Sequence, residues 1–153
     1  MACQDCLTRR EFLTKSTLAV AGAAVVVAGC GDGQIGAIAA PPLSQPLTLK
    51  VSTVPALATV GQLVLHPSNG GVAVKRTGAS TFLALSTTCT HEGTVINLLG
   101  SNSFECPNHH ARYDADGNVT HQPDASGNAS HLFTYGTQYD PATDILTVSS
   151  TLT

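Results

Sequence analysis

The sequence predicts an all-β, antiparallel domain that begins at residue 47, after an N-terminal leader and a tether. Three features point to this fold class. Short runs of β-branched or alternating apolar residues recur along the chain, turn-forming residues separate them, and no segment keeps a 3.6-residue apolar period over three turns. The 14 Gly and 8 Pro, with 11% charged residues and no Trp, suit short strands joined by turns better than a helical bundle.

Six runs of residues have the composition and alternation of strands. They are LTLKVSTV (47–54), QLVLH (62–66), GVAVKR (71–76), TFLALST (81–87), GTVINL (93–98) and DILTVSS (144–150). The turn signals PSNGG, RTGAS and DADGN lie between them. Because the chain has no internal repeat of fixed period, we expect one domain over residues 47–153, long enough to bury a core without disulfide bonds.

The charge balance excludes one class of partner. The chain carries a net charge of −3 at pH 7, and after residue 30 four Lys and Arg stand against eight Asp and Glu, which gives 4 − 8 = −4. A protein that binds nucleic acid through its phosphates needs a basic surface. We therefore expect no nucleic-acid partner.

Residues 1–30 have the features of an export signal and are not expected to form part of the folded domain. The stretch LTRREFLTK contains Arg9 and Arg10, and it resembles a twin-arginine signal, which a receptor reads as an address. The apolar run at 18–29 is about a dozen residues long, short of the roughly 20 that span a bilayer. It ends in VAGC, which resembles the box before the lipidated cysteine of bacterial lipoproteins, so we predict lipid on Cys30.

Alternatives to this interpretation of the leader remain open. The run at 18–29 is also consistent with an uncleaved apolar anchor in which Cys30 has no role. Cys3 and Cys6 form CQDC, which is typical of a redox or metal pair, but we expect both to be removed with the leader. Residues 31–46, GDGQIGAIAAPPLSQP, are small and almost uncharged, which predicts a flexible tether at the periplasmic face of a bacterial membrane.

Two pairs of cysteine and histidine carry the chemistry. Cys89 and His91 are two residues apart and follow a strand-like run; Cys106 and His109 are three apart and follow the strand-like NSFE. Thiolate and imidazole suit iron or zinc. If one zinc ion bound both Cys89 and His91, the two ligands would be closer in sequence than the ligand pairs of structural zinc sites usually are. The spacing is natural if each loop gives its cysteine to one iron and its histidine to another, as in a His₂Cys₂ [2Fe–2S] centre.

The segments CTHEG and CPNHHARYDADGNV resemble the two cluster-binding boxes of the Rieske iron–sulfur family. The resemblance is close over residues 86–119 and looser over residues 47–153. The positions in register are Cys89, His91, Cys106, Pro107, His109, Tyr113, Asp114 and Gly117.

The resemblance implies a ligand set and a more specific fold. Cys89 and Cys106 would bind the inner iron of one [2Fe–2S] cluster, and His91 and His109 the outer iron. The fold would be a Rieske-like antiparallel β-sandwich with a small subdomain built around the two cluster-binding loops. Zinc at these residues, or a site that has lost its metal, is the alternative.

Three neighbouring residues bear on the reduction potential. The high-potential respiratory members of the family have a Ser donor where this chain has Ala111, and a Tyr, kept here as Tyr113, that donates to a cysteine ligand. Glu92 follows ligand His91, and a carboxylate there favours the oxidised state. We therefore expect a potential in the lower or middle part of the roughly −150 to +300 mV range. Glu92 also stands where those members have an apolar residue at which quinol docks. A charge there argues against quinol docking; the alternative is that the Glu92 side chain simply points to water.

The shape of the loops raises two further points. His110 stands where the family usually has a Gly, so it competes with His109 as a ligand and strains the loop. The disulfide of the respiratory members would fall at Thr94 and Asn108, so packing must hold these loops together, with Pro107 as a shaping residue.

The other histidines have no partner at ligand spacing. His66, His121 and His131 are therefore expected to be surface or strand histidines.

Leader and site together predict an exported, membrane-tethered protein that carries single electrons. We expect a carrier or a small oxidoreductase subunit with no substrate site of its own, served by redox partner proteins, and whether it counts as an enzyme stays open. The alternatives are the Rieske subunit of a cytochrome bc-type quinol-oxidising complex and a non-redox, zinc-binding or structural lipoprotein. A terminal-oxygenase subunit would need a second domain, for which the chain is too short.

Overall fold

The computed structural model describes residues 41–150. The predicted export signal, with Cys3, Cys6 and the lipidation site Cys30, lies outside these residues, as do residues 31–40 of the predicted tether. Within the part of the chain that is described, no helix is long and apolar enough to cross a membrane.

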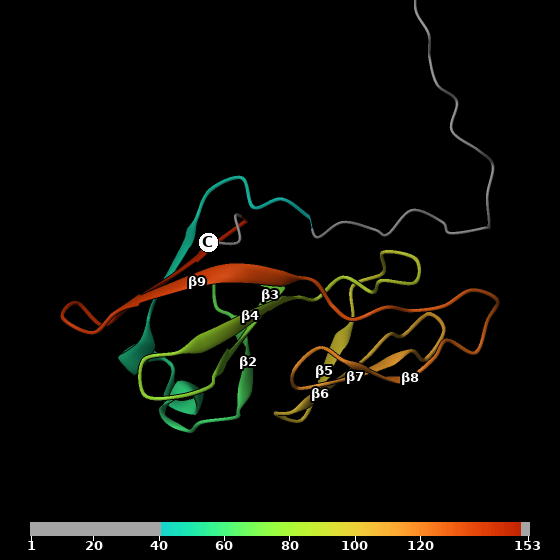
Figure 1. The fold of residues 1–153 in the computed structure, drawn as a ribbon, viewed down its shortest axis with the longest axis horizontal. Coiled ribbons are helices and arrows are strands. Elements are labelled where there is room, and N and C mark those ends of the chain that lie inside the picture. Colours follow the sequence, from blue (N-terminus) through green and yellow to red (C-terminus); the bar gives the residue numbers. More distant parts are fainter. Residues whose placement is uncertain (1–40, 151–153) are drawn as a thin grey trace, which may run out of the picture. The chain divides into compact units, whose positions relative to one another are not determined.

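The described chain folds into two antiparallel sheets that lie beside each other (Figure 1). The large sheet has six strands in the order β1-β10-β9-β4-β3-β2, and the small sheet has four in the order β5-β6-β7-β8. The strands are β1 (Leu47–Lys50), β2 (Leu63–His66), β3 (Asn69–Arg76), β4 (Phe82–Ser86), β5 (Asn97–Leu99), β6 (Ser103–Glu105), β7 (Arg112–Asp114), β8 (Val119–His121), β9 (Thr134–Asp140) and β10 (Ile145–Ser149). The predicted all-β, antiparallel fold class is confirmed.

The first predicted strand run is wrong in its second half. β1 ends at Lys50, and residues 51–58 form two 3₁₀ turns, η1 (Val51–Thr53) and η2 (Pro55–Ala58). Pro55 has no N–H to donate to a neighbouring strand, and the N–H of Val54 turns back to the Val51 carbonyl at 3.1 Å, so neither residue can extend the ladder of β1. The run 93–98 is likewise strand only from Asn97, because its first residues close a tight turn.

One central strand was not predicted by the sequence patterns. β9 lies between β10 and β4 in the large sheet. Its sequence, TYGTQYD, contains a Gly and several polar residues. Thr and Tyr favour strands, and Tyr135 and Tyr139 pack in one core, but the segment has no aliphatic residue to mark that face. β7 and β8 were missed because each has only three residues.

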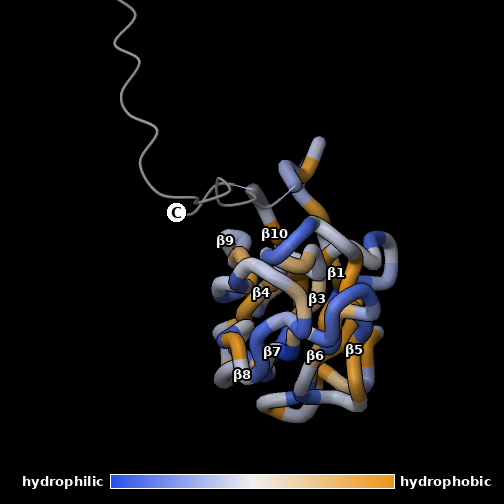
Figure 2. The backbone as a smooth tube through the Cα atoms, turned by 90° about the vertical axis from the view of Figure 1, so that its right-hand side faces the viewer, coloured by the Kyte–Doolittle hydropathy of each residue, from blue (hydrophilic) through white to orange (hydrophobic). Residues whose placement is uncertain are grey.

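Two hydrophobic cores cover opposite faces of the large sheet. Successive β3 residues alternate between them: Val72 and Val74 belong to one core and Ala73 to the other. Because both faces of β3 are covered, it reads as a continuous apolar run. In Figure 2, hydrophobic residues (orange) are gathered around β5 of the small sheet. The core between the sheets contains Leu63, Ala73, Leu85, Cys89, Ile96, Phe104, Cys106, Ala111, Tyr113, Ala129 and Leu132.

A tight turn between β7 and β8 explains two residues of the second sequence box. Asp114 accepts the backbone N–H groups of Asp116 and Asn118 on one carboxylate oxygen, at 2.8 and 2.9 Å. Gly117 has φ +82°, and a Cβ there would lie 3.0 Å from a methyl of Leu85 on β4. The turn therefore needs a Gly both for its conformation and for its close approach to the large sheet.

An ion pair between a buried lysine and an exposed aspartate fastens the small sheet to the large one. Lys75 is on the same face of β3 as Ala73, its side chain is 7% exposed, and its Nζ pairs with the carboxylate of Asp116 in the β7–β8 turn. An ammonium group at this depth needs such a partner because burial of an unpaired charge is costly.

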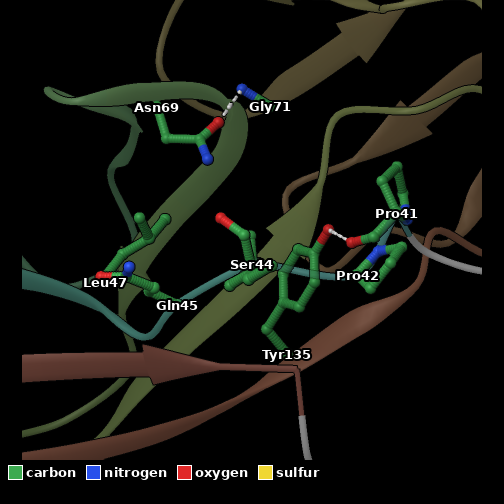
Figure 3. Close-up of a pocket in the computed structure, with 9 residues that line it drawn as sticks. Pro41, Pro42, Ser44, Gln45, Leu47, Asn69, Gly71 and Tyr135 are labelled. Atoms are coloured by element: carbon green, nitrogen blue, oxygen red, sulfur yellow. Dashed lines mark hydrogen bonds between the residues drawn. The ribbon is translucent and has the colours of Figure 1, made fainter.

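Residues 41–46, which the sequence analysis assigned to the tether, lie against the large sheet. Tyr135 of β9 donates its hydroxyl to the Pro41 carbonyl at 3.0 Å (Figure 3), and the backbone N–H of Leu43 donates to the Ser150 hydroxyl at 2.6 Å. The described chain thus enters the domain beside β9 and β10. A pocket between these residues and β3 contains none of the predicted ligands.

We expect Asp116→Ala to lower the free energy of unfolding by roughly 1–2 kcal/mol, because it leaves the buried Lys75 ammonium without its partner. Chemical denaturation followed by circular dichroism measures the loss. The matched control is Lys75→Met, which keeps an apolar stem and removes the buried charge. An Asp116→Ala variant as stable as the wild type, or more stable than Lys75→Met, contradicts this role.

Candidate metal centre

The first ligand loop is a tight turn that joins β4 to β5. The N–H of Cys89 donates to the Thr94 carbonyl at 2.7 Å, and the N–H of Gly93 donates back to the Cys89 carbonyl at 2.8 Å. Gly93 has φ +76°, in the left-handed region that suits a residue without a Cβ. These bonds present the side chains of residues 89–92 around one small loop.

The second ligand loop repeats this turn between β6 and β7. The N–H of Cys106 donates to the Ala111 carbonyl at 2.9 Å, and the N–H of His110 donates to the Cys106 carbonyl at 3.0 Å. His110 takes the left-handed position, with φ +57°. A residue with a Cβ is strained there, as expected for a residue that stands where the family usually has Gly.

The structure brings the two cysteines together in the core between the sheets. Cys89 and Cys106 are each 1% exposed, neither forms a disulfide, and their side chains are in contact. Burial raises the pKa of the Cys106 thiol, and contact with Cys89 acts in the same direction. The backbone N–H groups of Asn108 and His109 act against this by donating to the Cys106 sulfur. Donors of this kind are suited to a sulfur that carries negative charge when it binds a metal.

The two predicted histidine ligands also meet. The ring centroids of His91 and His109 are 5.0 Å apart with an interplanar angle of 71°. His91 is buried, whereas the His109 side chain is 28% exposed. The Nδ1 atom of His91 is buried and has no hydrogen-bond partner in the described structure.

These four side chains fit an iron–sulfur cluster. A buried imidazole nitrogen that has no hydrogen-bond partner costs stability. Its lone pair can instead be donated to a metal ion, which removes that cost. Two buried thiols beside two imidazoles form the mixed donor set of a His₂Cys₂ centre. Nitrogens of His91 and His109 and a Glu92 oxygen also lie within 4.8 Å of one another, a spacing that a single divalent ion can bridge.

His110 points away from this group of donors. Its Nδ1 lies 3.3 Å from a carboxylate oxygen of Glu105, and its side chain is 55% exposed. Arg112 shares Glu105, at 2.7 Å. Of the two adjacent histidines, the fold therefore places His109, and not His110, against His91.

Glu92 faces both imidazoles. Its carboxylate oxygens lie 3.4 Å from Nδ1 of His109 and 4.0 Å from Nε2 of His91, and the side chain is half exposed. The amide of Asn108 donates to the same carboxylate at 3.2 Å. Asn108 and Glu92 thus join the two loops, at one of the positions where respiratory members have their disulfide.

Tyr113 lies beneath the first loop and can donate to its sulfur. Its hydroxyl is 3.3 Å from Sγ of Cys89 and 3.4 Å from the N–H of Thr90, which donates to it. Burial, and after it the contact with Cys89, raises the pKa of Tyr113. The phenol therefore stays protonated, and a metal-bound thiolate, which has no proton, accepts its hydrogen bond. Ala111 is fully buried and offers the site no side-chain donor.

A third segment, which no sequence pattern predicted, closes over the first loop. Residues 122–130, named here the cap segment, contact both ligand loops: the Thr90 hydroxyl donates to the Ser130 carbonyl at 2.5 Å, and the N–H of Asp124 donates to the His109 carbonyl at 2.9 Å. Its sequence QPDASGNAS has no metal-ligand pattern. The cap segment bonds to His91 and Thr90, which lie 35 and 40 residues earlier in the chain. Bonds between such distant residues leave no pattern in the local sequence.

The remaining histidines do not join the site. His66 ends β2 and, unlike a surface residue, is 2% exposed; its Nδ1 lies 3.1 Å from the Ser68 hydroxyl. Burial lowers its pKa. His121 ends β8 and lies 4.0 Å from a carboxylate oxygen of Asp124, and His131 is exposed.

Comparison with known proteins finds a family match and similarity to solved structures. Residues 47–136 match the model of the Rieske [2Fe-2S] domain family. The cyanobacterial plasma membrane Rieske protein PetC3 from Synechocystis PCC 6803 is similar at 30% sequence identity and a TM-score of 0.41, over 58% of this chain and 86% of that chain. No curated protein matches the chain.

We expect His110→Gly to raise the free energy of unfolding by roughly 0.5–1 kcal/mol, because it relieves the left-handed strain at φ +57°. Thermal unfolding followed by circular dichroism measures the change. His121→Gly is the control: it places Gly in strand β8 and should be destabilising. A His110→Gly variant less stable than the wild type shows that the contact with Glu105 outweighs the strain.

Proposed function

The chain belongs to the Rieske [2Fe-2S] family, and from that premise we propose that it is an exported, membrane-tethered carrier that passes single electrons between partner proteins. A bound [2Fe–2S] cluster takes up and returns one electron at a time. Cys89 and Cys106 would hold its inner iron, and His91 and His109 its outer iron.

The buried, unpartnered Nδ1 of His91 is the observation that carries the ligand assignment. It lies on the same turn as Cys89, whose thiol contacts that of Cys106, and its ring lies against that of His109. No other group of described residues collects two buried thiols and two imidazoles.

The residues around the ligands are suited to hold charge, not to bind a substrate. The hydroxyl of Tyr113 and the amides of Asn108 and His109 donate to the two sulfurs, which stabilises negative charge on them. Ala111 adds no donor, and the Glu92 carboxylate disfavours the arrival of a further electron. These opposing effects support a potential in the lower or middle part of the family range.

Partner proteins are favoured over quinol as the source or acceptor of electrons. His109 is the more exposed of the two imidazoles, and it lies beside the Glu92 carboxylate. A charged group at this point opposes the docking of an apolar quinol ring and suits a polar or basic protein surface. This supports a carrier or small oxidoreductase subunit over the subunit of a cytochrome bc-type complex.

The leader supports the exported, tethered part of the proposal. Arg9 and Arg10 resemble a signal for the export of folded proteins, which suits a domain that must receive its cluster before export. Cys30 would carry the lipid that holds the domain at the periplasmic face of the membrane.

Electron paramagnetic resonance of the purified full-length chain, reduced with dithionite, tests the electron-carrying function. We expect two iron and two sulfide per chain and a rhombic signal with a low average g-value, which marks mixed His and Cys ligation. A chain that contains zinc, or that shows no signal when reduced, contradicts the proposal.

Membrane fractionation tests the tether. The wild-type chain should be found with the membrane after export, and Cys30→Ala should release it into the periplasmic fraction. Replacing Arg9 and Arg10 by Lys should retain the chain in the cytoplasm. A Cys30→Ala variant that stays in the membrane favours an uncleaved apolar anchor over a lipid.

We expect Glu92→Gln to raise the reduction potential by roughly 20–60 mV at low ionic strength, because it removes a negative charge that faces both imidazoles. The shift should shrink with added salt, since the side chain is half exposed. Asp140→Asn is the control, because it removes the same charge at the last residue of β9, a strand of the large sheet. A potential that is unchanged in Glu92→Gln shows that this carboxylate does not influence the site.

A further inference from the structure

We propose that the cap segment is a third positioning element of the cluster site: the Ser126 carbonyl holds Nε2 of His91 and thereby directs Nδ1 toward the iron. This rests on the proposed function, because it concerns a histidine that binds the outer iron. The cap segment lies outside both sequence boxes, and the spacing of the candidate ligands does not point to it.

The hydrogen bond of His91 determines which ring nitrogen is free. Nε2 lies 3.0 Å from the Ser126 carbonyl oxygen, which can only accept, so Nε2 carries the proton. The neutral ring then has its lone pair on Nδ1, the buried atom without a partner. The Ser126 carbonyl thus selects the tautomer and the ring orientation that a metal at Nδ1 requires.

The cap segment is held in place at both of its ends. The Thr90 hydroxyl donates to the carbonyl of Ser130 and accepts its N–H at 3.0 Å, so one threonine on the first ligand loop holds both backbone groups of one residue. The side chain of Gln122 accepts the N–H of Ala129 at 2.8 Å and donates to its carbonyl at 3.3 Å. The Ser126 carbonyl is therefore held against His91 by bonds that do not involve His91 itself.

Gly127 is the residue that allows the cap segment to approach so closely. It has φ +101°, and a Cβ there would lie 3.0 Å from Nε2 and 3.3 Å from Cδ2 of His91. Any other residue would strain the backbone and push directly on the imidazole. At Gly61, with φ +92°, no atom lies within 4 Å of an added Cβ.

The cap segment gives the two imidazoles different hydrogen bonding and different exposure to solvent. His91 donates to a carbonyl and is 6% exposed, whereas His109 has a partly exposed ring beside Glu92. A carbonyl acceptor on Nε2 makes the imidazole a stronger electron donor through Nδ1, which stabilises ferric iron. The cap segment therefore lowers the reduction potential through His91 alone.

The test is Gly127→Ala in the full-length, cluster-loaded chain. Pulsed electron paramagnetic resonance of the reduced protein resolves the nitrogen couplings of the coordinating imidazoles, and the wild type should show two. In Gly127→Ala one coupling should shift while the other stays, and the reduction potential should rise. Gly61→Ala is the matched control, because it introduces the same left-handed strain without a contact; its couplings and potential should equal those of the wild type.

The outcomes separate this inference from the proposed function. A wild-type chain without two nitrogen couplings contradicts the ligand assignment itself. If the wild type shows two couplings and both are the same in Gly127→Ala, the ligand assignment stands and only the positioning role of the cap segment is overturned. A folded Gly127→Ala chain that loses its cluster, where Gly61→Ala keeps it, supports the role.

A second variant covers the case in which Gly127→Ala does not fold. Gln122→Met removes both side-chain bonds to Ala129 without touching His91. It should shift the same single nitrogen coupling by a smaller amount. A coupling unchanged in Gln122→Met would then overturn the proposal.

Discussion

The burial of two thiols between two sheets is the constraint on which the rest of the structure depends. Cys89 and Cys106 are almost fully enclosed, and burial raises the pKa of the Cys106 thiol. A thiolate at this depth is costly unless a cation binds it and hydrogen-bond donors surround it. Tyr113 and the amides of the second loop are those donors. The site is thus one that a metal cluster completes.

The same tight turn, used twice, brings the candidate ligands to one place. In both loops the cysteine carbonyl accepts the N–H four residues later, and that later residue is left-handed. One loop has Gly93 at this point and the other has the strained His110. Without a disulfide between them, the loops are joined by Asn108 and Glu92 and by the cap segment, which bonds to both. Hydrogen bonds do here what a covalent link does in the respiratory members.

The large sheet supports the small one through few but specific contacts. Lys75 crosses from β3 to the β7–β8 turn, and Gly117 lets that turn pack against Leu85. These contacts fix the β7–β8 turn against β3 and β4. The asymmetry of the imidazoles follows from the same arrangement. The cap segment, between β8 and β9, bonds to the ring of His91, whereas at His109 it bonds only to the backbone carbonyl.

The sequence by itself determined the all-β class, the family and the candidate ligands, because strand alternation, turn residues and ligand spacing are local patterns. It missed β9, whose Gly and polar residues hide its central place. Only the tertiary structure decided that His109 rather than His110 lies against His91, and that Glu92 faces both rings. It alone placed Ser126 on His91, because a bond across 35 residues depends on how the whole chain folds back and on no local pattern.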